Sequence, residues 1–191
     1  MGSDADPGQV ADCSARFQHV EGVSFVTTDA LRGREFDGAF DAIVCMEVLE
    51  HCPADVQEAV LDDLRRLARP GGLVVISVPI EIGPALAAKQ GARALAASRG
   101  LREYSTRERY SPRELLRMVC ATGRTAVPRE EVALEVAPGR VLRYTGHKGF
   151  NWRALEPLVR RRFDVGRRLF SPMPWMGPWL NSQVWFECRR T

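Results

Sequence analysis

The sequence lacks a long hydrophobic run, a paired-cysteine motif and a secretory leader pattern. No apolar stretch approaches the ~20 residues that cross a bilayer, and the polar, acidic segment Met1–Gln9 is unlike a signal peptide. The five cysteines are odd in number and scattered, which argues against a disulfide framework and against a structural zinc site. These absences predict a soluble, cytoplasmic protein with no membrane partner.

Strong charge of either sign is also lacking. The formal net charge is +3 and the isoelectric point is near 8.7, so a nucleic-acid partner is not expected. No G-x-x-x-x-G-K-S/T loop occurs, which argues against a nucleotide-binding fold that cradles phosphate. A late group of basic residues is more typical of a solvated helix face than of a phosphate-binding stripe. Its members are Arg160, Arg161, Arg162, Arg167 and Arg168.

What is present is the composition of one ordinary globular domain, with 191 residues of which 45% are hydrophobic and 27% charged. Within it, the apolar run Phe40–Met46 predicts a strand buried on both faces. From Pro53 to Leu67 apolar residues recur at helical spacing, and Pro70–Gly72 suits a stop before a second buried strand at Leu73–Val78. This order predicts a βαβ unit and therefore a parallel sheet.

The remaining elements are predicted from shorter patterns. Further strands are expected at Val23–Val26, Val132–Val136, Arg140–Tyr144, Asp164–Leu169 and Gln183–Cys188. Helices are expected at Ile82–Arg102, in a short segment that begins at Ser111, and at Trp152–Phe163. A loop rich in proline and tryptophan separates the last two strands, which predicts an antiparallel hairpin at the edge of the sheet.

Residues 40–51, FDAIVCMEVLEH, resemble the fourth motif of class I S-adenosylmethionine-dependent methyltransferases, in the F-D-x-I-x-x-x-E-V-L-E-H form of small-molecule enzymes. The helix ending LARPGG and the strand LVVISVP continue the resemblance, which is close over residues 3–80 and loose over the C-terminal hairpin. It implies an α/β fold: a Rossmann-like three-layer sandwich with a mostly parallel sheet and a C-terminal antiparallel hairpin. It also implies a single domain over 1–191, with a core of 1–81 and 146–191 and an inserted acceptor or lid region at 82–145.

The resemblance implies S-adenosylmethionine as cofactor, bound at the carboxyl ends of the strands. The implied contacts are Asp4, Asp29, Ala30, Cys45, Met46 and Glu47. In the family the acid at the position of Asp4 binds the ribose hydroxyls, and the acid at the position of Asp29 approaches the adenine amine. The plainer alternatives are a disordered N-terminal residue for Asp4, a turn residue for Asp29 and a helix cap for Glu47.

The departure from the family is the missing acid-x-G-x-G loop that holds the methionine part of the cofactor. Neither Ala137–Gly139 nor Gly146–Gly149 fits this motif, so a circular permutation is unsupported. We therefore expect an N-terminally incomplete fold that binds cofactor poorly and exposes an unpaired strand edge. Such an edge invites association, for example as a homodimer. An upstream start, a fragment and a decayed paralogue are all compatible with this pattern.

Methyl transfer requires alignment of the acceptor and, for a hydroxyl, removal of its proton. The resemblance makes His51 the candidate general base, with a structural role in the loop as the alternative. The spacing Glu47-x-x-Glu50-His51 also resembles a cluster that holds Mg²⁺ or a related ion in some quinone-biosynthesis and small-RNA 3′-end methyltransferases. His147 is a candidate for a further ligand or for an acceptor contact. His147 has the alternative of capping the following helix. Because most E-V-L-E-H sequences need no metal, none is expected here.

Three late aromatic residues, Phe170, Trp175 and Trp179, either line an apolar acceptor pocket or cover the open end of the sheet. The predicted function is transfer of a methyl group from S-adenosylmethionine to an oxygen or nitrogen of a small-molecule acceptor. A non-catalytic methyltransferase-like domain that acts by protein association is the main alternative, and a metal-assisted RNA methyltransferase is a weaker one.

Overall fold

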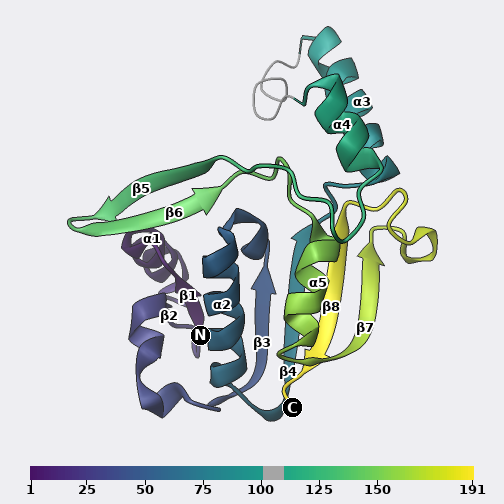
Figure 1. Cartoon of the computed structure of the whole chain (residues 1–191). Coiled ribbons are helices and arrows are strands. Elements are labelled where there is room, and N and C mark those ends of the chain that lie inside the picture. Colours follow the sequence, from purple (N-terminus) through teal and green to yellow (C-terminus); the bar gives the residue numbers. More distant parts are fainter. Residues whose placement is uncertain (101–109) are drawn as a thin grey trace.

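The structure is a computed structural model that describes residues 1–100 and 110–191 (Figure 1). Its N-terminal part is a parallel pair of short strands, β1 (Gly2–Asp4) and β2 (Phe25–Thr27), connected through helix α1 (Pro7–Phe17). The Asp6 carboxylate accepts a hydrogen bond from the Gly8 amide and caps α1. Two short 3₁₀ turns, η1 (Thr28–Arg32) and η2 (Arg34–Phe36), lead to the main sheet.

The main sheet has the order β3-β4-β8-β7. Its strands are β3 (Phe40–Met46), β4 (Ala68–Pro79), β8 (Gln183–Arg189) and β7 (Asp164–Ser171). β3 and β4 are parallel and are joined by the 3₁₀ turn η3 (Leu49–His51) and helix α2 (Ala54–Leu67), while β8 runs antiparallel to both β4 and β7. The predicted βαβ unit, the C-terminal hairpin and the α/β, Rossmann-like class are confirmed.

The hydrophobic core lies between the main sheet and the two helices α2 and α5 (Trp152–Arg160), which stand side by side in Figure 1. The core is formed by Leu61, Leu64, Val74, Ile76, Leu155, Val159, Phe163, Val184 and Phe186, all buried. Arg162 links the two helices at the surface, because its guanidinium pairs with Asp62 (2.6 Å) and Glu58 (3.2 Å). The expectation that the late arginines form one helix face is wrong, because only Arg160 lies in α5, whereas Arg167 and Arg168 lie on β7.

Two details of the predicted βαβ unit are wrong. β3 is not buried on both faces, because Val44 and Met46 are 59% and 51% exposed. The exposed residues Ala42, Val44 and Met46 alternate along the strand and therefore share one face of the sheet, which is not covered. β3 is also an edge strand, which pairs with β4 alone among the described residues. The helix does end before Pro70, at Leu67, but the second strand begins at Ala68 and not at Leu73. Pro70–Gly72 therefore lies within β4, at a bulge where the pairing jumps from Phe40–Ala68 to Ala42–Leu73.

The segment between the main strands makes two distinct structures. Helices α3 (Pro84–Ser98) and α4 (Pro112–Val119) pack together beyond the carboxyl end of β4 (Figure 1). Ser111 and Glu114 form the predicted capping box of α4, and the end of the predicted helix Ile82–Arg102 lies outside the described residues.

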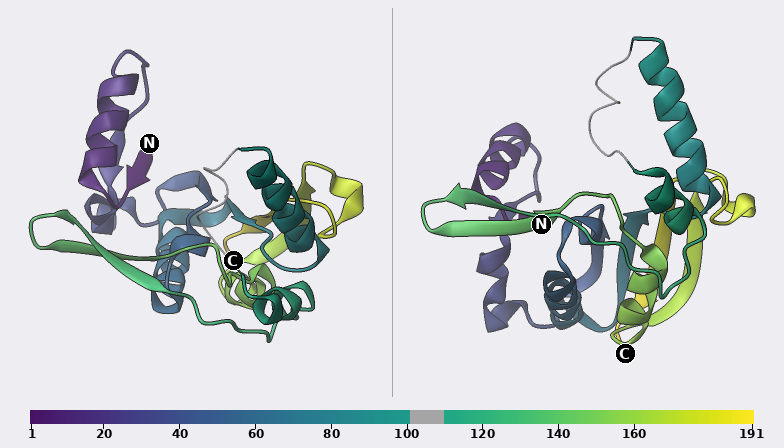
Figure 2. Two further views of the ribbon diagram at one scale, coloured as in Figure 1. Left: turned by 90° about the horizontal axis from the view of Figure 1, so that it is seen from above. Right: turned by 45° about the horizontal axis from the view of Figure 1, so that its top comes forward.

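The second structure is the long hairpin of β5 (Glu131–Ala137) and β6 (Arg140–Thr145). It reaches from the main sheet to the N-terminal unit, as the views of Figures 1 and 2 agree. β5 contacts α1, β6 contacts η3, and Arg140 at the turn pairs with Asp29 at 2.7 Å. The hairpin therefore bridges two sheets that share no strand ladder among the described residues.

The loop between β7 and β8 contains the 3₁₀ turn η5 (Pro174–Met176) and is held by one buried side chain. The Asn181 Oδ1 accepts from the Met173 amide, and Nδ2 donates to the Met173 and Gly177 carbonyls, each at 2.6 Å.

Within the described ranges, no helix has both the length and the apolar character that a membrane span requires.

Replacing Asn181 with alanine removes all three bonds and leaves backbone groups without partners. We expect Asn181→Ala to lower the free energy of unfolding by about 2–3 kcal/mol, measured by urea denaturation. Ser182→Ala, which removes only an exposed 3.4 Å contact to the Ser171 carbonyl, serves as the control and is expected to change little. Equal effects of the two substitutions would contradict this account of the loop.

Candidate active site

The chain takes an unusual backbone conformation immediately after β3. Glu47 has φ of 53°, which makes it the one non-glycine residue with positive φ in the described part of the chain. Such residues are uncommon and concentrate at functional sites. The Glu47 amide donates to the Ser77 carbonyl (3.1 Å), and its carboxylate accepts from the Ser77 hydroxyl (3.3 Å). Glu47 is therefore tied to the neighbouring strand end, and the cap position of α2 is occupied by Pro53.

Glu50 follows in η3 and is completely buried. Within the described residues neither of its carboxylate oxygens has a hydrogen-bond partner. Burial raises the pKa of Glu50 to about 8, and the Glu47 charge adds to this, whereas its own backbone amide and the Arg129 charge oppose it. An unpartnered buried carboxyl is costly to fold around, and strongly shifted acids in such places often mark functional sites.

Two imidazoles meet beside this carboxyl. His51 Nδ1 lies 3.1 Å from the Thr145 carbonyl oxygen, and its Nε2 lies 3.1 Å from Nε2 of His147 and 3.8 Å from Oε1 of Glu50. A carbonyl can only accept, so Nδ1 carries the proton and Nε2 of a neutral His51 carries the lone pair. The donor atoms of Glu50, His51 and His147 all lie within 4.8 Å of one another.

The backbone around this cluster is fixed by buried and half-buried polar side chains. Arg129 donates to the carbonyls of Glu50 and Gly146, the latter at 2.9 Å, and the Thr145 hydroxyl donates to the Glu50 carbonyl at 3.2 Å. Gln57 donates from α2 to the carbonyls that flank the turn. The sequence analysis missed Arg129 and Gln57. A buried glutamine in the first turn of an amphipathic helix is a weak signal, and nothing in the local pattern marks Arg129.

The role of His147 is also clarified. The helix α5 that follows it is capped by Asn151, whose side chain accepts from the Arg153 amide at 3.1 Å. His147 therefore does not cap this helix and instead faces His51. From the sequence, only the resemblance to certain methyltransferases indicates that His147 lies near His51.

The predicted cofactor contacts lie at the strand ends but on two separate sheets. Asp4 ends β1 and accepts from the Asp6 amide at 2.8 Å, so it is an ordered strand residue. Asp29 lies in η1, where Arg140 (2.7 Å) and Arg32 (3.2 Å) pair with its two oxygens. Ala30, next in the chain, is exposed.

At the end of β3, the exposed side chain is that of Met46. Cys45 is buried, and burial raises the pKa of its thiol to about 12. Its side chain is therefore turned into the core, which leaves only its backbone for a ligand.

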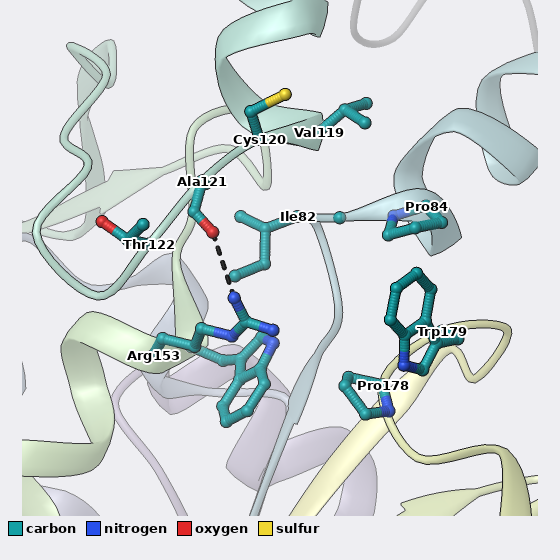
Figure 3. Close-up of a pocket in the computed structure, with 11 residues that line it drawn as sticks. Ile82, Pro84, Val119, Cys120, Ala121, Thr122, Arg153, Pro178 and Trp179 are labelled. Carbon is teal, nitrogen blue, oxygen red and sulfur yellow. Dashed lines mark hydrogen bonds between the residues drawn. The ribbon is translucent and has the colours of Figure 1, made fainter.

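A pocket of about 400 Å³ opens beyond the carboxyl end of β4 (Figure 3). Its walls are mostly apolar and come from Ile82, Pro84, Val119, Trp152, Pro178 and Trp179. Arg153 supplies the charged group and donates to the Ala121 carbonyl at 3.1 Å. Of the three aromatic residues proposed for such a pocket, Trp179 lines it. Trp175 is 82% exposed, and Phe170 packs against Trp152 at 6.0 Å between ring centres.

Residues 1–72 match the family model described as a methyltransferase domain. A search of curated proteins finds no match to this chain. The fold resembles that of a protein from Pyrococcus horikoshii OT3, with a TM-score of 0.58, 14% identity and coverage of 100% of this chain and 70% of that one.

Two further solved structures are similar. One is a structure from work on the conversion of a disulfide bond into a thioacetal group during echinomycin biosynthesis. Its TM-score is 0.55 at 16% identity, over 99% of this chain and 65% of that one. The other is an S-adenosylmethionine dependent methyltransferase from Mesorhizobium loti, with a TM-score of 0.50 and 17% identity, over 99% of this chain and 79% of that one.

This chain thus spans about two thirds to four fifths of the length of these three structures. The match of residues 1–72 to a methyltransferase domain and the fold shared with these structures show that the chain has a methyltransferase-like fold.

Proposed function

We propose that this protein transfers a methyl group from S-adenosylmethionine to an oxygen or nitrogen of a small-molecule acceptor. The observation that carries the proposal is the fixed tautomer of His51. Its Nδ1–H donates to the Thr145 carbonyl, so Nε2 presents a lone pair just beyond β3, where ligands of open α/β sheets bind. An imidazole held in this way is suited to take a proton from an acceptor.

The cofactor, when bound, supplies an electrophilic methyl group on sulfur, and the chain positions the acceptor for in-line attack. We infer that Asp4 and Asp29 contact the ribose and adenine, with Ala30, Met46, Glu47 and the backbone of Cys45 completing the site. The positions of these residues at strand ends support the assignment. Because Arg140 of β6 pairs with Asp29, the hairpin β5–β6 lies beside the proposed cofactor site, which supports a role for it in covering the cofactor.

The pocket beside Trp179 is the proposed acceptor site. Its apolar walls and the single guanidinium of Arg153 would suit a small, partly apolar molecule with an anionic or hydrogen-bond-accepting group. Helices α3 and α4 approach it from the inserted segment, which supports an acceptor-binding role for that segment.

One observation favours association as a second candidate function. Within residues 1–100 and 110–191, β3 pairs on one side only, and Val44 and Met46 expose apolar side chains on it. An unpaired edge with an apolar face is a template for pairing with another chain. A chain that is folded, binds no cofactor and self-associates would favour this candidate over the enzyme.

Calorimetric titration with S-adenosylhomocysteine tests the cofactor site. We expect weak binding, because the sequence lacks the acid-x-G-x-G loop, and a further loss of about tenfold or more in Asp29→Ala, because a charge-assisted hydrogen bond is removed. Asp63→Ala is the matched control, since Asp63 is also an exposed acid paired with an arginine (Arg66, 3.1 Å), and it should bind as the parent does. Equal binding by parent and Asp29→Ala would remove Asp29 from the site.

The role of His51 is tested by His51→Asn, which keeps a side-chain N–H for the Thr145 carbonyl but removes Nε2. We expect methyl transfer to fall by roughly 10²–10⁴-fold, with affinity for S-adenosylhomocysteine unchanged. The measurement is radiolabelled methyl incorporation across a panel of small hydroxyl and amine compounds. His19→Asn, at an exposed site away from the cluster, is the control. Undiminished turnover in His51→Asn would exclude a role for Nε2 in the reaction.

A further inference from the structure

We propose that Trp152 and Arg153 form an anion-binding subsite in the pocket beside Trp179, and that this pocket takes a small carboxylic acid with an apolar body. The two residues are consecutive at the start of α5, and both line the pocket. The guanidinium carbon of Arg153 lies 5.4 Å from the centre of a Trp152 ring. An indole N–H and a guanidinium are therefore close together at the same pocket. The inference rests on the proposed function, in which this pocket is the acceptor site, and it names the class of acceptor.

The first observation is the indole N–H of Trp152. The residue is 2% exposed, and its Nε1 has no hydrogen-bond partner among the described residues. The ring itself is held in place, because it packs against Phe170 and Phe186 at 6.0 and 6.5 Å between ring centres. A buried indole N–H usually has a partner, and burying one without a partner opposes folding. Since Trp152 lines the pocket, a ligand bound there can supply the missing acceptor.

The second observation is the charge of Arg153. Among the described residues that line the pocket, it is the one charged side chain. It donates to the Ala121 carbonyl at 3.1 Å (Figure 3), and within residues 1–100 and 110–191 it pairs with no acid. By contrast, Arg160 and Arg168 both pair with Glu156, at 2.8 and 2.9 Å. A guanidinium carries five N–H donors, so Arg153 has donors left for an anion.

The surroundings of Arg153 favour an anion with a single charge. Glu81, next to the lining residue Ile82, is buried and already pairs with Lys89 at 2.8 Å. Arg153 also lies in the first turn of α5, where the helix dipole adds a partial positive charge. One guanidinium and one neutral N–H match the two oxygens of a carboxylate. A dianionic phosphate would leave a charge without a partner among mostly apolar walls, so we infer a carboxylate.

The rest of the pocket indicates the body of the ligand. Its volume of about 400 Å³ is near the lower end of the range for small-molecule sites, which suits a single ring with its substituents. Figure 3 draws Arg153 and Trp179 on opposite sides of Ile82. A molecule whose carboxylate meets Arg153 would therefore place its apolar part against Ile82 and Trp179. The proposed acceptor is accordingly a small aromatic acid with a separate hydroxyl or amine that receives the methyl group.

The test uses benzoate as the probe and the indole N–H groups of the four tryptophans as the readout. In a nitrogen-15 correlation spectrum of the whole chain, Trp152→Phe identifies the peak of Trp152. We expect benzoate to move this peak downfield, because its proton gains an acceptor. The peak of Trp185, which does not line the pocket, should stay in place. Benzamide, a neutral molecule of the same shape, should bind about tenfold more weakly or less, because the charge-assisted bond is lost.

A second variant tests the charge without changing the indole. Arg153→Met should weaken benzoate binding by about tenfold or more in the same titration. Arg161→Met is the matched control, since Arg161 is an exposed arginine at the other end of α5, and it should bind as the parent does. Circular dichroism checks that each variant is folded.

The proposal is overturned if benzoate leaves the Trp152 peak in place, or if Arg153→Met binds benzoate as tightly as the parent. Tighter binding of phenyl phosphate than of benzoate would overturn the choice of a carboxylate. Titration with S-adenosylhomocysteine on the same samples separates these results from the proposed function. Benzoate binding without cofactor binding would keep the subsite and remove the methyl-transfer role, and cofactor binding without benzoate binding would do the reverse.

Discussion

A carboxyl group buried at the end of β3 is the constraint around which this site is organised. Glu50 has no hydrogen-bond partner among the described residues, whereas its own carbonyl receives bonds from both Arg129 and Thr145. The nearby polar side chains thus bond to the backbone of η3, whereas the Glu50 carboxyl lies next to the two imidazoles. Burial of this kind opposes folding unless something else compensates it. The geometry of the cluster is therefore better explained by chemistry than by stability.

The hairpin β5–β6 determines how the two sides of the site relate to each other. Its base carries Thr145, which orients His51, and its turn carries Arg140, which pairs with Asp29. The N-terminal strands share no ladder with β3 among the described residues, so the sheet itself does not fix these distances. Arg66 adds a second link, since it bonds both Asp37 (2.6 Å) and the Leu31 carbonyl (2.8 Å) from α2. A change at the hairpin turn would reach both the cofactor side and the histidines.

The local sequence pattern predicted the positions of helices and strands better than it predicted their burial and their contacts with distant segments. The bounds of β3 and the capping box of α4 follow from residue order alone, because hydrophobic period and capping are local. The predicted burial of β3 failed because it presumed neighbours on both sides, which no window of sequence reveals. The pairing of His51 with His147, 96 residues apart, came from resemblance, and Arg129 gave no signal at all. Contacts between distant segments depend on the path of the hairpin, which short-range periodicity does not encode.

The two functions considered for this chain make different demands on the residues after β3. Association through the β3 edge needs exposed backbone and apolar side chains such as Val44, and it gains nothing from a buried acid or a strained Glu47. Methyl transfer to a hydroxyl needs a fixed lone pair next to the acceptor, and Nε2 of His51 can supply it. Burying the Glu50 carboxyl opposes folding, whereas an exposed strand edge does not, so the cluster is the feature that a function has to explain. This argument favours catalysis. The exposed edge of β3 follows from the separation of the N-terminal strands from the main sheet among the described residues.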